Sequence, residues 1–426
     1  MRDFVKYGTE KLEIEIPDGY RVQTMLPREH QGDGRSEEQI VRDALLHPIG
    51  CGMLNEEIAP GDKVCILTND ITRLTRSHIY IPILVEKLNE AGIPDDDITI
   101  LFANGMHSAM SEEQMFSLIT KEVYHRVHVF QHDCVNSPCD LVGTTSFGHE
   151  VWANKIAMEA DKLILTGGIL VHHMAGFGGG RKDIIPGCAS KKTILSNHKM
   201  VVSPNAQAGV LEGNPVHEDF MEACAFTHPA YLLNVLCDDH GQICDCVAGH
   251  WRDAYMNGTE RAKKLYLYPI EKRPDVVIAS AGGFPKDIDL RQSKKGFYNA
   301  SRAVKQGGTV ICLAECREGC SKEMDDPFEE WLGRFRTLDA VRDELNRNVN
   351  MGGLNCYKVR EVQSHCRLIL ITSLDHERMA KVDVECYPKE QLNQVIRDVL
   401  ASYQDPDVLY MPQAGLTLPC IQSKND

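Results

Sequence analysis

Short apolar runs alternate along the chain with longer segments in which apolar residues recur at helical spacing. Continuous apolar runs bounded by turn residues are typical of strands buried on both faces of a parallel sheet. Such runs lie at 63–68, 98–102, 163–165, 231–236, 275–283, 309–313 and 367–372, and helical patterns lie at 36–46, 77–91, 111–119, 297–304 and 328–346. This alternation predicts an α/β protein.

The length of the chain predicts two domains, because 426 residues are many for one hydrophobic core. A basic, tyrosine-rich segment at 261–273 precedes a new strand-like run and marks a plausible boundary. We expect an N-terminal α/β domain over 1–268, a C-terminal α/β domain over 269–405, and a tail over 406–426 that packs back on the body. The expected fold class is two Rossmann-like α/β domains with the active site in the cleft between them.

Three strand-like runs of the first domain end in polar or titratable residues. Asp70 and Arg73 follow the first run, His107 follows the second, and His172 follows the third. Ligands of doubly wound sheets bind beyond the carboxyl ends of the strands, so these residues predict a site. Taken singly, Asp70 has an alternative role as a helix cap, Arg73 as a solvated side chain and His107 as a structural loop histidine.

The segment 163–200 is the most informative part of the chain. It holds two adjacent histidines, Lys182, His198 and four glycines at 176, 178, 179 and 180. Glycines let backbone N–H groups approach a bulky anion, so the segment predicts a nucleotide-sized cradle with reactive groups on its rim. The alternative is a glycine-rich surface turn with scattered histidines.

Two familiar nucleotide motifs do not fit this segment. A Walker loop needs glycine before its lysine and serine or threonine after it, whereas Arg181 precedes Lys182 and Asp183 follows. The dinucleotide fingerprint fails as well, because Arg181 stands where Gly176-x-Gly178 requires a third glycine. Neither an ATPase nor an ordinary Rossmann dehydrogenase is indicated.

The second domain contributes a charged loop after the run 275–283. Arg291 and Lys295 are placed to clamp a carboxylate, and Gln292 to donate a hydrogen bond to one. The alternative is that these residues are only the charged start of a helix.

Composition narrows the class of protein. Apolar content of 43% and charged content of 25% are ordinary for a soluble globular protein, and the charged N-terminal start leads us to expect a cytoplasmic protein without membrane association. Sixteen cysteines without paired CxxC spacing indicate free thiols. A net charge of −15 argues against a nucleic-acid partner and favours a small-molecule ligand beside the local basic groups.

The order and spacing of these residues resemble the nickel-dependent lactate racemase family. The resemblance runs from the strand before Asp70 to the terminal LTLP at 416–419, and its most specific part is the segment 175–187. It implies a nickel-pincer nucleotide, in which a pyridinium mononucleotide (nickel pyridinium-3,5-bisthiocarboxylic acid mononucleotide) holds nickel through a ring carbon and two sulfurs. Cofactor-biosynthesis enzymes would load it.

The resemblance also implies roles for individual residues. Lys182 matches the lysine that can bind the cofactor as a thioamide, and His198 matches the protein ligand of nickel. His107 and His172 match the acid/base histidines. Asp70 matches a carboxylate that orients the site, and we group it with the cofactor-binding residues. The substrate-binding positions of the family are matched by Arg73, Gln292 and Lys295. The residues matched to the nucleotide phosphate are the glycines Gly176, Gly178, Gly179 and Gly180.

The implied reaction is inversion of C2 of a 2-hydroxy acid. One histidine takes the hydroxyl proton while hydride moves to the pincer ring, the 2-keto acid rotates, and hydride returns to its other face. This route avoids forming a carbanion at a carbon that is barely acidic.

One position departs from the family pattern. Arg291 stands where lactate racemases carry an aromatic residue, and Trp331 does not replace the aromatic residue expected in the second domain. An extra guanidinium suits a larger or more polar acid, such as a sugar acid or a dicarboxylate. The alternatives are lactate racemase proper, a nicotinamide-type dehydrogenase, and a nickel or nucleotide carrier without racemase activity.

Overall fold

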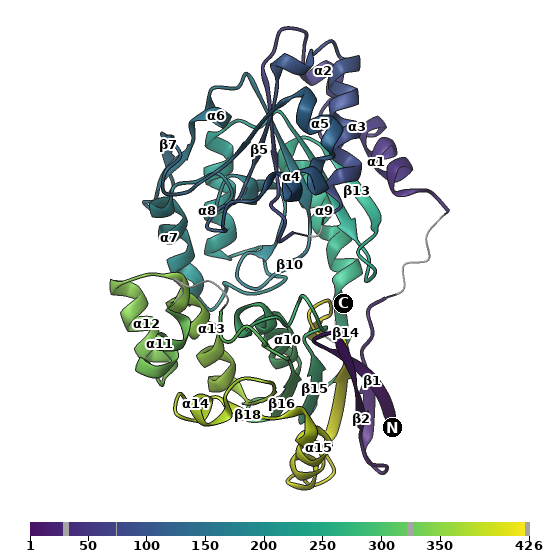
Figure 1. Ribbon diagram of the computed structural model, residues 1–426, viewed down its shortest axis with the longest axis vertical. Coiled ribbons are helices and arrows are strands. Elements are labelled where there is room, and N and C mark those ends of the chain that lie inside the picture. Colours follow the sequence, from purple (N-terminus) through teal and green to yellow (C-terminus); the bar gives the residue numbers. More distant parts are fainter. Residues whose placement is uncertain (29–33, 74, 322–326, 422–426) are drawn as a thin grey trace. The chain divides into compact units, whose positions relative to one another are not determined.

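A computed structural model of the protein describes residues 1–28, 34–73, 75–321 and 327–421. The chain forms two compact units, a central unit of residues 28–265 and a terminal unit of residues 1–27 and 266–426. Figure 1 labels their α-helices and some of their strands. Within the described ranges, every helix is too short or too polar to cross a bilayer.

The central unit is built on a six-stranded sheet. Its order is β13 (Ile243–Gly249), β12 (Tyr231–Cys237), β9 (Lys162–Gly168), β4 (Val64–Thr68), β5 (Ile98–Phe102) and β6 (His128–Gln131). The strands pair in parallel except β13, which is antiparallel to β12. The chain proceeds from β4 outward to β6 and then returns to the other side of β4 with β9. The topological switch point therefore lies between β4 and β9.

Helices bury their apolar faces on this sheet. Ser36 begins α1 with a capping box, in which its Oγ accepts from the Gln39 N–H, and Ser111 begins α4 in the same way. One face is covered by α1 (Glu37–Leu46), α2 (Leu54–Glu57), α3 (Ser77–Glu90), α4 (Glu112–Ile119) and α5 (Lys121–Arg126), whose apolar residues share a core with the strands. The helices α6 (Lys155–Met158), α7 (Lys191–His198), α8 (Pro215–Phe226) and α9 (Trp251–Tyr266) and the hairpin of β7 (Cys139–Thr144) and β8 (Glu150–Asn154) complete the unit (Figure 1).

The terminal unit contains a second six-stranded sheet, which is entirely parallel. Its order is β18 (Glu385–Tyr387), β17 (Arg367–Ile371), β16 (Thr309–Leu313), β15 (Val276–Ser280), β19 (Asp407–Met411) and β3 (Arg21–Thr24). Smaller pairs are β1 (Arg2–Tyr7) with β2 (Glu10–Glu15) and β14 (Leu267–Ile270) with β20 (Leu418–Ile421). The helices are α10 (Leu290–Ala303), α11 (Phe328–Arg334), α12 (Leu338–Arg347), α13 (Met351–His365), α14 (His376–Ala380) and α15 (Leu392–Ala401). Two α/β units confirm the predicted fold of two α/β domains, whereas an active site in a cleft between them stays a prediction.

The domain boundaries differ from those predicted. The first 27 residues group with the terminal unit rather than with the N-terminal domain. They are held there because β3 pairs with β19, and because the Gly8 N–H donates to the Asp287 carboxylate at 2.7 Å. The segment predicted as a tail instead contributes a strand to the second sheet, because β19 lies between β15 and β3. Residues 422–426 of that segment lie outside the described ranges.

Two helices differ from the sequence prediction for local reasons. The predicted helix at 328–346 is two helices, because Thr337 caps a new start at α12. The helix predicted from residue 297 begins at Leu290, because the Asp289 side chain accepts from the Gln292 N–H.

Candidate active site

The carboxyl ends of three parallel strands meet at one edge of the central sheet. Thr68 of β4 is level with Phe102 of β5, and Leu67 is level with Leu165 of β9. The loops carrying Asp70, His107 and His172 all leave from this edge, next to the switch point. The prediction that these strand ends converge is confirmed.

Asp70 and His107 form a hydrogen-bonded pair. Asp70 Oδ2 lies 2.9 Å from His107 Nδ1, and Asp70 Oδ1 accepts from the Thr72 N–H at 2.7 Å. Burial alone would raise the pKa of Asp70, but hydrogen bonds from His107 and Thr72 and the charges of His107 and Arg73 outweigh it and lower the pKa to about 2. An ionised Asp70 keeps the ring proton of neutral His107 on Nδ1, which leaves Nε2 as the basic atom.

His172 and Lys182 form a second pair. The Lys182 amine lies 2.9 Å from His172 Nε2, while His172 Nδ1 accepts from the backbone N–H groups of Ala175 at 3.2 Å and Met174 at 3.4 Å. The hairpin of β10 (Val171–His172) and β11 (Gly176–Phe177) sets this geometry, because it folds the chain back between the two residues.

The glycine loop packs against the protein's own chain. A Cβ at Gly176 would lie 2.2 Å from the Val210 carbonyl oxygen, one at Gly179 would lie 2.6 Å from the Asn234 side chain, and one at Gly180 would lie 2.9 Å from the Tyr255 ring. These glycines are buried, and Gly178 is only partly exposed. The bare backbone is thus required by internal packing as well, and the phosphate-binding role of the loop remains a prediction.

Arg181 is the internal anchor of this loop. Its side chain is fully buried, and its guanidinium donates to the carbonyls of Ala175, Phe177, Gly178 and Gly179 at 2.9 to 3.2 Å. The same group lies 4.3 Å from the centre of the Tyr255 ring. Burial lowers the pKa of Arg181. Arg181, which stands where the dinucleotide fingerprint has its third glycine, therefore holds the loop closed through these hydrogen bonds.

The loop after β5 is tied to the glycine segment. Gly105, with φ of +57°, donates its N–H to the Gly187 carbonyl at 2.9 Å, and Gly187 donates to the Lys182 carbonyl at 2.9 Å. A Cβ at Gly187 would lie 2.4 Å from the Asp183 carbonyl oxygen. His107 and Lys182 are thereby fixed within one backbone network.

His198 is the last residue of α7 and is 7% exposed. Its Nδ1 lies 3.3 Å from Asn197 Oδ1, and its ring centre lies 6.2 Å from that of Phe220. Phe220 also lies beneath the Lys182 amine, with 5.8 Å from that nitrogen to the ring centre. In the described part of the chain, His, Cys, Asp and Glu side chains form no group of three or more placed to hold a metal ion.

The predicted residues of the second domain lie on the first turns of α10. Arg291 is buried at 8% exposure, whereas Gln292 and Lys295 are exposed. The intervening Lys294 is buried and donates to Asn355 of α13. That these residues face the central unit across a cleft remains a prediction.

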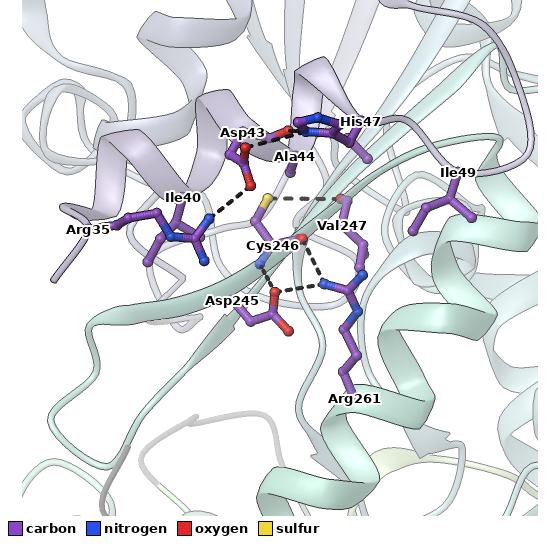
Figure 2. A pocket seen from close by; sticks show the side chains of 11 residues that line it. Arg35, Ile40, Asp43, Ala44, His47, Ile49, Asp245, Cys246, Val247 and Arg261 are labelled. Atoms are coloured by element: carbon purple, nitrogen blue, oxygen red, sulfur yellow. Dashed lines mark hydrogen bonds and ion pairs between the residues drawn. The ribbon is translucent and has the colours of Figure 1, made fainter. Parts of the chain in front are cut away.

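A polar pocket elsewhere in the central unit is a poorer candidate. It lies between α1, β13 and α9, as Figure 2 shows. Its two arginines already pair with carboxylates, Arg35 with Asp43 and Arg261 with Asp245, each at 2.8 Å. None of the residues predicted from the sequence lines it.

Sequence reasoning missed several residues around the predicted site. Asn197, Asp219 and Phe220 surround His198 and Lys182, yet none stands at a strand end or in a glycine loop. Burial together with the charges of Arg181 and Arg252 lowers the pKa of His217 to about 3, so this histidine is neutral at pH 7. The only available signal was the polar run from Asn214 to Asp219 at the start of α8.

Comparison with known proteins identifies two matching family domains. Residues 7–209 match the lactate racemase N-terminal domain, and residues 270–397 match the lactate racemase C-terminal domain. Lactate racemase of Thermoanaerobacterium thermosaccharolyticum is 35% identical over 82% of this chain and 81% of its own length, and that of Lactiplantibacillus plantarum is 35% identical over 69% and 72%.

Solved structures give the same result. The lactate racemase apoprotein from Thermoanaerobacterium thermosaccharolyticum matches with a TM-score of 0.88 and 30% identity over 99% of this chain and 100% of its own. A protein from Thermotoga maritima, 18% identical, shares the fold with a TM-score of 0.68 over 93% of this chain and 100% of its own.

The protein is thus an isomerase of the racemase type. It belongs to the lactate racemase family, as its residue pattern predicted.

Proposed function

We propose that the protein inverts C2 of a 2-hydroxy acid by reversible hydride transfer through a 2-keto acid, with a nickel-pincer nucleotide as cofactor. The observation that carries the proposal is the pair of histidines whose loops leave one sheet edge, His107 beside Asp70 and His172 beside Lys182. Two bases of this kind suit a reaction that must remove and return a hydroxyl proton in two orientations.

The side chains of the central unit fit this cofactor. His198 would supply an imidazole donor to the nickel, a ligand type that suits this metal. Lys182 supplies an amine for thioamide attachment beside the glycine loop. When bound, this group supplies the acceptor and donor of hydride for C2.

The chain's own residues handle the protons. His107 Nε2 accepts the hydroxyl proton of one configuration, because Asp70 holds Nδ1 and stabilises the imidazolium that forms. His172 serves the other configuration; its Nε2 lies 2.9 Å from the Lys182 amine, which attachment of the cofactor would consume. Arg73 binds the substrate carboxylate, and Gln292 and Lys295 complete its polar contacts.

The substrate is proposed to be larger or more polar than lactate. Arg291 places a buried guanidinium on α10 where the family pattern has an aromatic residue, and a sugar acid or a dicarboxylate would supply an oxygen acceptor for it. Lactate itself is the second candidate, because the curated relatives are named for it.

The test begins with nickel per chain, by elemental analysis, after co-expression with the pincer-synthesising enzymes. Near-stoichiometric nickel in the wild type that is lost in His198→Ala supports the cofactor assignment. A panel of hydroxy acids then identifies the substrate, and retention of the substrate's own C2 hydrogen in deuterated water supports hydride transfer. Solvent deuterium at C2 would exclude it, and NAD-dependent net oxidation would indicate a dehydrogenase.

A further inference from the structure

A chain of hydrogen bonds leads from His198 to a buried carboxylate that the reaction itself does not use. His198 Nδ1 lies 3.3 Å from Asn197 Oδ1, and Asn197 Nδ2 donates to Asp219 Oδ2 at 2.8 Å and to the Val216 carbonyl at 3.2 Å. Because the amide NH₂ has two acceptors, the orientation of the Asn197 side chain is fixed with Oδ1 toward the imidazole. An acceptor at Nδ1 keeps the ring proton there and leaves the lone pair on Nε2.

The other polar side chains of this network form hydrogen bonds with Asp219, either directly or through Asn197. Asp219 is completely buried, and its Oδ1 accepts from Thr145 Oγ1 at 2.6 Å. Both of its oxygens lie 3.2 Å from His149 Nδ1. Donors from α7 and from the turn between β7 and β8 thus hold the carboxylate in one orientation. A carboxylate held so firmly can orient what is bonded to it.

We propose that Asn197 and Asp219 are positioning residues for the nickel ligand, a proposal that rests on the assignment of His198 to nickel. Asp219 fixes the Asn197 amide, and that amide fixes the tautomer and ring orientation of His198, so that Nε2 is presented to the metal. Histidine ligands of metals are commonly oriented through their other ring nitrogen in this way. His149 and Thr145 act one step further out, through Asp219.

The competing explanation is that Asn197 only fastens α7 to α8, since Asp219 and Val216 both lie on α8. If Asn197 only joins the two helices, replacing it should lower the thermal stability of the protein and leave the His198 tautomer and the nickel release rate unchanged. The positioning role predicts, in addition, a changed tautomer of His198 in the metal-free protein and faster loss of nickel from the loaded protein.

The experiment compares four variants with the wild type. Asn197→Leu removes the amide at similar volume, and Asn197→Asp sets two carboxylates against each other. The double exchange Asn197→Asp with Asp219→Asn restores one carboxylate and one amide in reversed order. Ser196→Ala is the matched control, because Ser196 precedes Asn197 on α7 and its hydroxyl donates to the Lys192 carbonyl on the same helix.

Two readouts are taken at temperatures well below each variant's unfolding midpoint. Nitrogen NMR of the metal-free, histidine-labelled protein reports which ring nitrogen of His198 carries the proton. Nickel release from the loaded protein to a chelator reports how firmly the ligand is held. We expect release about 10- to 100-fold faster in Asn197→Leu and Asn197→Asp, a rate near the wild type's in the double exchange and in Ser196→Ala, and an Nδ1–H tautomer in the wild type that Asn197→Leu loses.

The outcomes separate this inference from the function it rests on. A wild type that takes up no nickel overturns the cofactor assignment and the positioning role with it. A loaded wild type whose release rate is unchanged by Asn197→Leu overturns the positioning role alone. So does an Nε2–H tautomer in the wild type, or a double exchange that regains stability but still releases nickel quickly.

Discussion

The amine of Lys182 lies 2.9 Å from Nε2 of His172, and the opposite ring nitrogen accepts from the backbone N–H of Ala175 at 3.2 Å. The contact joins the residue expected to bind the cofactor with a residue expected to carry a proton.

Lys182→Ala is expected to abolish covalent attachment of the cofactor, because the Lys182 amine, beside His172, is the group proposed to form the thioamide. Intact mass of the denatured, loaded protein measures the adduct directly. Lys191→Ala, at an exposed position on α7, is the matched control and should keep the adduct. An adduct of unchanged mass in Lys182→Ala would show that the cofactor is attached elsewhere.

Asp70→Asn is expected to lower kcat by about 10²- to 10⁴-fold with a smaller effect on KM. The amide presents no charge to stabilise the His107 imidazolium and no longer fixes the ring proton on Nδ1. Steady-state racemisation of the identified substrate, followed by polarimetry, measures the change. Asp133→Asn, at a surface turn, is the control. An unchanged kcat in Asp70→Asn would remove His107 from the set of acid/base residues.

The ionisation of Asp70 makes the free energy of unfolding depend on pH. Folding lowers the pKa of Asp70 from 3.8 to about 2, so its contribution of about 2 kcal/mol is present above pH 4 and is lost as the pH falls toward 2. Urea unfolding should show Asp70→Asn less stable than the wild type at pH 7, with the difference shrinking below pH 4. A difference that persists unchanged at pH 2 would contradict this linkage.

Arg181→Met is expected to destabilise the fold by at least about 3 kcal/mol, because it leaves several buried carbonyls without their donor. Arg42→Ala removes an exposed ion pair with Glu86 and should cost less than about 1 kcal/mol. Chemical unfolding of both variants measures the contrast. Equal losses would mean that the carbonyls of the glycine loop find other donors.

The positions of the strand ends could be predicted because apolar runs and their terminal polar residues are local patterns. β5 and β16 have the predicted bounds, and Asp70, His107 and His172 follow strands of one sheet edge. The place of the first 27 residues could not be predicted in this way. It depends on the pairing of β3 with β19, which joins segments almost 400 residues apart and leaves no local signal.

The surroundings of the site were less predictable than its reactive groups. Glycines at 176, 179 and 180 suggest an open cradle in sequence, whereas tertiary packing against Val210, Asn234 and Tyr255 fills the space beside them. The sequence alone gives Asn197 and Asp219 no special role, because the hydrogen bond between them forms only when α7 and α8 lie together. Patterns along the chain therefore identify side chains at strand ends better than the partners that orient them.

Arg291 provides the sharpest test of substrate choice. Replacing it with phenylalanine restores the aromatic character of the family pattern and removes a charged donor, so kcat/KM for a polar hydroxy acid should fall about 10- to 100-fold, while that for lactate should rise. Arg302→Ala, near the other end of α10, is the matched control. The measurement is kcat/KM of the loaded wild type and both variants on lactate, a sugar acid and a hydroxy dicarboxylate. If the wild type prefers lactate and Arg291→Phe leaves that preference unchanged, Arg291 does not select the substrate, and the extra guanidinium serves the fold of the terminal unit instead.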